Sequence, residues 1–130
     1  MALNSIEEII AVTKRNFPNI ITILGGGIVT SDKEAVCETF EPDFAVTGEG
    51  EETLLELINC LENNESFLEV KGIGYSTRHL DKPQNDQQSY ELIGQSRENS
   101  WHFTPARDPI DDIDAIPYPD FDLIDLEDYF

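Results

Sequence analysis

Hydrophobic residues near the start of the chain change from helical spacing to one unbroken run. Over residues 6–16 the apolar side chains recur three and four positions apart, which predicts an amphipathic helix with one buried face. Ser5 and Glu8 have the spacing of a capping box and would begin this helix. Residues 20–24 are then all apolar or β-branched, with no polar alternation. This run predicts a strand buried on both faces of a parallel sheet.

Three glycines follow this strand directly. Residues 25–27 allow a sharp turn or a close approach of the backbone to a ligand, because no Cβ stands in the way. Ser31 and Glu34 have the spacing of a second capping box, so the next helix is expected over residues 32–40. Strand, glycine turn and helix together make half of a βαβ unit, and ligands of such folds bind where the strands end.

The same order of elements then repeats. Residues 44–46 are apolar and predict a second short buried strand, and residues 47–50 form another glycine-containing connection. A third helix is expected from Glu51, with its core face formed by Leu54, Leu57, Ile58 and Leu61. The order αβαβα implies a parallel sheet covered by helices. Two parallel strands alone leave edges uncovered, so further strands must complete the sheet or lie outside this chain.

Past this point the pattern changes twice. Strands are predicted at residues 68–70 and 73–77, where two glycines indicate bulges or close approaches, and residues 90–93 and 100–104 could pair as a hairpin. From Pro105 onward the chain is acidic and contains prolines, with separate apolar anchors. We therefore divide the chain into an α/β region (1–66), a strand and hairpin extension (67–104) and an extended acidic linker (105–130).

Charge and cysteine content narrow the function classes. The 130 residues contain 27 acidic and 8 basic side chains, a net charge of −19. Such a surface repels nucleic acid and anionic lipid. No apolar run approaches the roughly 20 residues that span a bilayer, and the first residues lack the pattern of a signal peptide. Cys37 and Cys60 share no metal-ligand spacing and are expected to be reduced, half-buried thiols of a cytoplasmic protein.

Four segments in this order resemble one family. They are the Leu-Gly-Gly-Gly run at residues 24–27, the run Asp-Phe-Ala-Val-Thr-Gly-Glu-Gly-Glu at residues 43–51, Gly-Ile-Gly-Tyr at residues 72–75, and Asp-Ala-Ile-Pro-Tyr-Pro-Asp-Phe-Asp-Leu at residues 114–123. Together they resemble the cobalamin-binding domain of radical S-adenosylmethionine enzymes, and residues 82–100 look like an insertion. The resemblance implies a partial Rossmann-like (flavodoxin-like) domain followed by a linker to a radical S-adenosylmethionine barrel.

The resemblance also implies what this chain would contribute. Cobalamin would be the cofactor, bordered by Gly25, Gly26, Gly27, Thr47, Gly48, Glu49 and Gly50. The family's cobalt-ligating histidine motif and its iron–sulfur cysteines have no match in the chain, so S-adenosylmethionine and the 4Fe-4S cluster would be held by the rest of the parent enzyme. The chain would then be the C-terminal half of the domain, would have no catalytic residue of its own, and would belong to a methyltransferase or Fe-S oxidoreductase.

Other interpretations of the same residues stay open. The glycine turn could serve close helix–strand packing alone, and residues 48–52 could be a helix start capped by its own carboxylates. A dinucleotide or phosphate loop is disfavoured, because Thr30 stands where the third glycine would be and Gly-Lys-Ser/Thr is absent. His79 and His102 are expected at the surface or in hairpin packing. The alternative function is a small acidic protein-interaction module without cofactor, which could form a homodimer through an exposed sheet edge.

Overall fold

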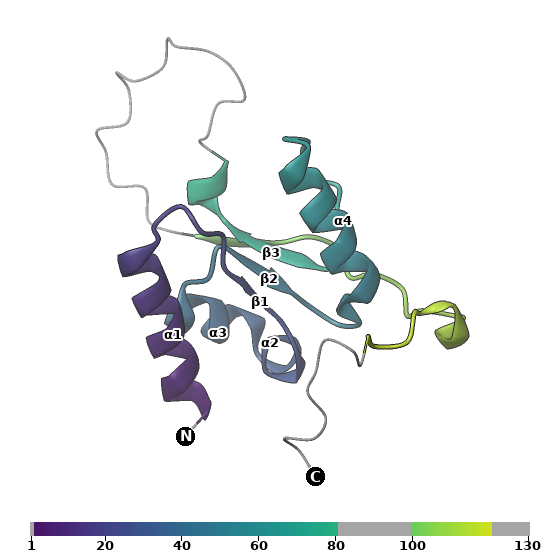
Figure 1. The fold of residues 1–130 in the computed structure, drawn as a ribbon, viewed down its shortest axis with the longest axis horizontal. Helices are drawn as coiled ribbons and strands as arrows, with labels where there is room; N and C mark the ends of the chain where they lie inside the picture. The colour runs from purple at the N-terminus through teal and green to yellow at the C-terminus, as the bar shows by residue number, and fades with distance from the viewer. Residues whose placement is uncertain (1, 81–99, 121–130) are drawn as a thin grey trace.

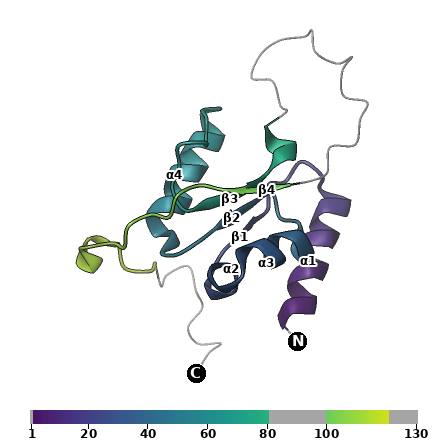
Figure 2. The same ribbon diagram turned by 180° about the vertical axis from the view of Figure 1, so that it is seen from behind.

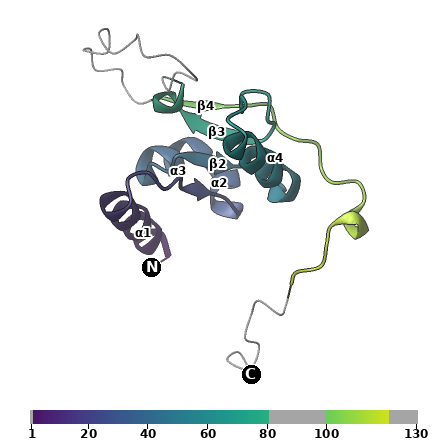
Figure 3. The same ribbon diagram turned by 45° about the horizontal axis from the view of Figure 1, so that its top comes forward.

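The computed structural model describes residues 2–80 and 100–120, which form three layers (Figure 1). An open sheet is the middle layer. Helices α1 (Ala2–Asn16), α2 (Gly27–Ser31) and α3 (Lys33–Phe40) lie on one face of it, and α4 (Gly50–Glu62) lies on the other (Figures 1 and 3). The view from behind shows α1, α2 and α3 together below the sheet (Figure 2). The predicted α/β class is confirmed.

The sheet is mixed, with one parallel pair. Its order is β1 (Ile23–Leu24), β2 (Phe44–Val46), β3 (Ile73–Ser76) and β4 (Trp101–Phe103). The first two strands are parallel, whereas β2 with β3 and β3 with β4 are antiparallel. The prediction of a parallel sheet is therefore right for β1 and β2 and wrong for the rest. After α4 the chain returns to the carboxyl end of β2, where the Thr47 N–H donates to the Gly72 carbonyl (2.9 Å), so β3 enters from that end.

The first strand is shorter and more exposed than the sequence pattern predicts. Only Ile23 and Leu24 pair with β2, both side chains are half-buried, and Ile20 and Ile21 are exposed. The prediction of a strand buried on both faces is wrong. Its physical reason is position: β1 is the edge strand of the described sheet, and no described element covers its outer side.

Two apolar cores, one on each face of the sheet, hold the layers together. Toward α3 the buried residues are Val29, Val36, Cys37, Phe40 and Ala45, with Ile6 and Ile10 of α1 packed against them. Toward α4 they are Phe44, Val46, Leu57, Val70 and Ile73. The predicted buried strand β2 is confirmed, since its three residues contribute to both cores.

Helix ends differ from the capping predictions. Helix α1 already begins at Ala2, so Ser5 lies inside it. Asp32, one residue past Ser31, caps α3 by accepting from the Ala35 N–H (3.3 Å). On α4 the sheet-facing residues are Thr53 and Leu57, while Leu54 and Ile58 of the predicted core face are exposed.

The region after α4 agrees only in part with prediction. Residues 68–70 form a turn instead of a strand, and β4 pairs with β3. The proposed hairpin partner at residues 90–93 lies outside the described residues. Gly74 is a close approach, as predicted, because a Cβ there would lie 2.6 Å from the Phe103 ring. Residues 104–120 are irregular except for one 3-10 turn, η2 (Ile113–Ala115).

One carboxylate ties four segments together at the amino ends of β1 and β2. Asp43, which is 5% exposed, accepts hydrogen bonds from the Thr22 N–H and hydroxyl (both 2.8 Å). It also forms an ion pair with Lys14 of α1. His79 Nε2 of η1 (Thr77–His79) lies 3.1 Å from its other oxygen, and the Arg78 guanidinium lies at 3.6 Å. Burial alone would raise the pKa of Asp43, but the hydrogen bonds from His79, Lys14 and Thr22 hold that pKa well below its usual range.

Among the described residues, no helix has both the length and the apolar content needed to cross a membrane.

Replacing Asp43 with asparagine should lower the free energy of unfolding by about 3 kcal/mol, because it removes the buried carboxylate that pairs with Lys14 and accepts hydrogen bonds from Thr22. Urea unfolding followed by circular dichroism at pH 7 measures this difference. Asp111→Asn, at an exposed position, is the matched control and should change stability by less than about 0.5 kcal/mol. An equally small effect of Asp43→Asn would contradict the role assigned to Asp43.

The same pair of proteins should differ in pH dependence. Because the folded-state pKa of Asp43 is depressed, its stabilisation is complete above the unfolded-state pKa near 4 and is lost as the pH falls below that value. The stability difference between wild type and Asp43→Asn should therefore shrink between pH 5 and pH 2. A difference that grows over this range would contradict the direction of the shift.

Candidate functional site

The candidate site lies at the carboxyl ends of β1 and β2. Asp43 lies at the other end of these strands, next to their amino ends. Because these two strands are parallel, the loops that follow them meet at the same edge. Residues 25–27 follow β1 and residues 47–50 follow β2, so the structure brings the two predicted loops together. This edge is where ligands bind in open α/β sheets.

The first loop is a glycine turn that leads into α2. Gly26 is the N-cap of α2 and has a φ of +95°, which L side chains rarely adopt. Gly27 is the first residue of the helix. The sequence analysis missed this five-residue helix, because the capping pattern at Ser31 indicates a start only near residue 32. The glycine run at a strand end was the available signal for an earlier helix.

The four residues of the second loop have different local roles. The Thr47 hydroxyl donates to the Gly72 carbonyl (3.1 Å), so this side chain is held by β3's approach segment. Gly48 has a φ of +71°, and Glu49 is the N-cap of α4. A Cβ at Gly50 would lie 3.1 Å from Val46 Cγ1, a tight contact that a side chain could make only if Val46 shifted slightly.

A hydrogen bond joins the second loop to α2, the helix into which the first loop leads. The Gly48 N–H donates to the Thr30 hydroxyl (3.1 Å), which itself donates to the Gly26 carbonyl (3.3 Å). Thr30 is therefore a structural part of the site that the sequence analysis considered only as a departure from a glycine fingerprint. The bond fixes the spacing of the glycine turn relative to the start of α4.

Open space lies beside the glycines of this edge. A Cβ built at Gly26, Gly27 or Gly48 would meet no atom within 4 Å, and one at Gly25 would make only ordinary contact with Val46 at 3.8 Å. Close helix–strand packing therefore explains none of the three glycines of the first turn. Gly26 is explained by its backbone conformation, but Gly27 is required by neither packing nor backbone.

The acidic start of α4 is bound by the chain that follows β4. Glu49 makes no side-chain cap bond and instead accepts from the Ile110 N–H (2.7 Å). Arg107 donates to the Thr53 hydroxyl (2.9 Å), pairs with Glu56 and lies 3.6 Å from Glu52. The interpretation of a helix start capped by its own carboxylates is therefore wrong for Glu49, because residues 107–110 supply its partner.

The described side chains around these two loops limit what could bind or react there. Glu51 and Glu52 in the first turn of α4 disfavour a phosphate at that helix terminus. Within residues 2–80 and 100–120, no cluster of histidine, cysteine or carboxylate side chains could hold a metal ion. Cys37 is fully buried, and burial together with Glu34 and Glu38 raises its pKa to about 11, so it is a poor nucleophile.

The predicted thiols are free, as expected from their spacing. Cys37 is more buried than predicted, whereas Cys60 is half-buried, and burial near Glu65 and Glu56 raises its pKa. His79 differs from its predicted surface or hairpin role: it stacks on Phe44 (5.0 Å between ring centroids) and faces Asp43. Nothing in its local sequence indicates this contact, because Asp43 is 36 residues away.

Comparison of the chain with known proteins found no match to a family model, a curated protein or a solved structure.

Alanine substitutions at Gly26 and Gly27 should distinguish a glycine that is required by its backbone conformation from one that only has open space beside it. Gly26→Ala should lower the free energy of unfolding by about 1 kcal/mol, because it places a Cβ at positive φ. Gly27→Ala adds a methyl group in open space at a helical position and should leave stability unchanged or raise it by up to about 1 kcal/mol. Thermal unfolding of both variants measures the difference. A larger loss for Gly27→Ala would contradict the open space beside it.

Proposed function

We propose that this chain is the C-terminal half of a cobalamin-binding domain of a radical S-adenosylmethionine enzyme, together with the linker toward its barrel. The observation that carries the proposal is the open space in front of the two glycine loops at the carboxyl ends of β1 and β2. Gly27 in particular has no structural reason to be glycine, so room for a ligand is the explanation we favour.

The described residues fit one wall of such a site. A corrinoid presents a flat ring edged with neutral amide groups, which can pack against glycine backbone and hydrogen-bond to it. Gly25, Gly26 and Gly27 would border the cofactor from the first loop, and Gly48 from the second. Glu49 and Thr47 are engaged by Ile110 and Gly72, so we expect them to position the loop and not to contact the cofactor directly.

The chain's part in the reaction would be binding and orientation. Bound cobalamin would supply alkyl transfer or redox chemistry at cobalt, and we assign no side chain of residues 2–80 and 100–120 to that step. The remaining walls of the site, the S-adenosylmethionine and the 4Fe-4S cluster would come from other parts of the parent methyltransferase or Fe-S oxidoreductase. The segment that follows β4 would connect the two parts, and Arg107 and Ile110 would fix where it leaves the domain.

Titration with hydroxocobalamin tests this proposal. Isothermal calorimetry and visible absorbance should show saturable one-to-one binding to the wild-type chain. Gly27→Leu fills the open space without requiring a positive φ and should weaken binding at least about tenfold, whereas Gly27→Ala should retain most of it. The two variants form a matched pair, since they differ only in side-chain size at one position.

Folding of both variants must be checked by circular dichroism, because only a folded Gly27→Leu variant reports on the site. Equal affinity of the two variants would contradict a cofactor wall at the glycine turn. Absence of binding to the wild-type chain at millimolar hydroxocobalamin would contradict binding by this chain and leave the interaction module as the function to test.

A further inference from the structure

The negative charge of this protein is unevenly distributed along the sequence. Residues 1–31 contain two acidic and two basic side chains, so the whole net charge of −19 comes from residues 32–130. These first residues include α1 and β1. The segment that contains α1 and β1 therefore has no net charge within a strongly acidic protein, so another acidic chain can approach it more easily than the rest.

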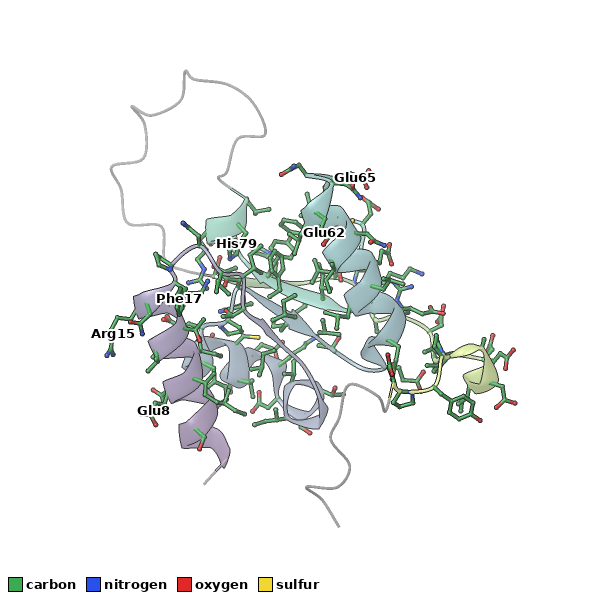
Figure 4. The ribbon with its side chains drawn as sticks, viewed as in Figure 1. Glu8, Arg15, Phe17, Glu62, Glu65 and His79 are labelled. Carbon is green, nitrogen blue, oxygen red and sulfur yellow. The ribbon has the colours of Figure 1, made fainter. Side chains whose placement is uncertain are left out.

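The same segment carries exposed apolar side chains. Ile20 and Ile21, which lead into β1, are 49% and 45% exposed. Ile9 of α1 is 64% exposed, because α1 packs against the core through Ile6 and Ile10 instead, and Phe17, which directly follows α1, is 60% exposed. Figure 4 shows Phe17 at the end of α1, with Arg15 pointing away from the sheet. Grouped exposed side chains of this kind mark interaction surfaces.

The backbone of β1 is also open on this side. Thr22 faces β2, since its carbonyl accepts from the N–H groups of Asp43 and Phe44 (2.9 and 3.1 Å). By the alternation of a strand, the N–H and C=O groups of Ile21 and Ile23 point to the outer side, where the described residues place no other strand. An open edge of this kind can pair with a further strand.

We propose that two copies of this chain form a symmetric dimer by antiparallel pairing of their β1 edges. The geometry fixes the register: a twofold axis at Thr22 sets Ile21 opposite the partner's Ile23, and these are the residues whose backbone groups point outward. Both side chains lie on the α4 face by alternation with Leu24, which packs toward α3. Four isoleucines would then form one apolar cluster across the axis.

Charge favours a second copy over a chain of unrelated composition at this face. A cationic partner would be drawn to residues 32–130, which carry the net negative charge, whereas residues 1–31 have no net charge and can meet the same residues of a second copy without net repulsion between the two segments. The two negative bodies would still repel each other at a distance. Dimerisation should therefore strengthen when salt screens this repulsion.

Analytical ultracentrifugation of the full chain between 5 and about 300 µM tests the proposal. We expect a monomer–dimer equilibrium whose dissociation constant falls at least about threefold between 0.05 and 0.5 M sodium chloride. Ile21→Glu should raise that constant at least about tenfold, because it places a carboxylate beside the partner's isoleucines. Leu55→Glu, which adds the same charge at a 62% exposed position on α4, should raise it less than about twofold.

Hydrogen exchange gives a readout that does not depend on a variant. The amides of Ile21 and Ile23 should become protected as protein concentration rises, while that of Thr22, already bonded to Asp43, should not change. A monomer at all concentrations in 0.5 M salt, or a dimer with unprotected Ile21 and Ile23 amides, would overturn the proposal. No cobalamin is used in either measurement, so a failure of the dimer proposal can be told apart from a failure of the cofactor proposal.

Discussion

The fold depends on one buried carboxylate at the amino ends of the parallel strands. Asp43 joins α1 through Lys14, β1 through Thr22 and η1 through His79, and it directly precedes β2. The parallel pair has few hydrogen bonds of its own, because β1 is only two residues long. The side chain of Asp43 therefore supplies part of the hydrogen bonding between the two segments that a longer β1 would supply through its backbone. Without it, the edge strand and α1 would be held to the rest mainly by Ile6, Ile10 and Leu24.

The two ends of the parallel pair have separate roles. At the amino ends of β1 and β2, charged side chains pair with each other. At the carboxyl ends lie glycines with open space beside them and the hydrogen bond from the Gly48 N–H to the Thr30 hydroxyl. A scaffold that is fixed at one edge can leave the other free to receive a ligand. Residues 107–110 approach this free edge through Glu49, so the segment leaving the domain is tied to the loop that we propose as a cofactor wall.

Local patterns were enough to predict α1, α3 and α4, though not their exact ends, and β2, but they did not predict α2. Local patterns did not predict that β3 runs antiparallel to β2. Residues 68–70 have the composition of a strand but form a turn, and the chain reverses its direction only at the next turn, at Gly72. The exposed state of Ile20 and Ile21 was also missed, since an apolar run reads the same at an edge as in a sheet centre. Long-range partners such as Asp43 with His79, or Glu49 with Ile110, leave no local signal.

The central claim is that the carboxyl edge of β1 and β2 is a ligand-binding face. Two-dimensional NMR of the labelled chain with hydroxocobalamin, which is diamagnetic, tests it most directly. The account predicts saturable shifts of the amide signals of Gly25, Gly26, Gly27 and Gly48, with the amides of Thr22 and Asp43 unmoved. Shifts spread over the whole chain, or confined to the Asp43 edge, would contradict it.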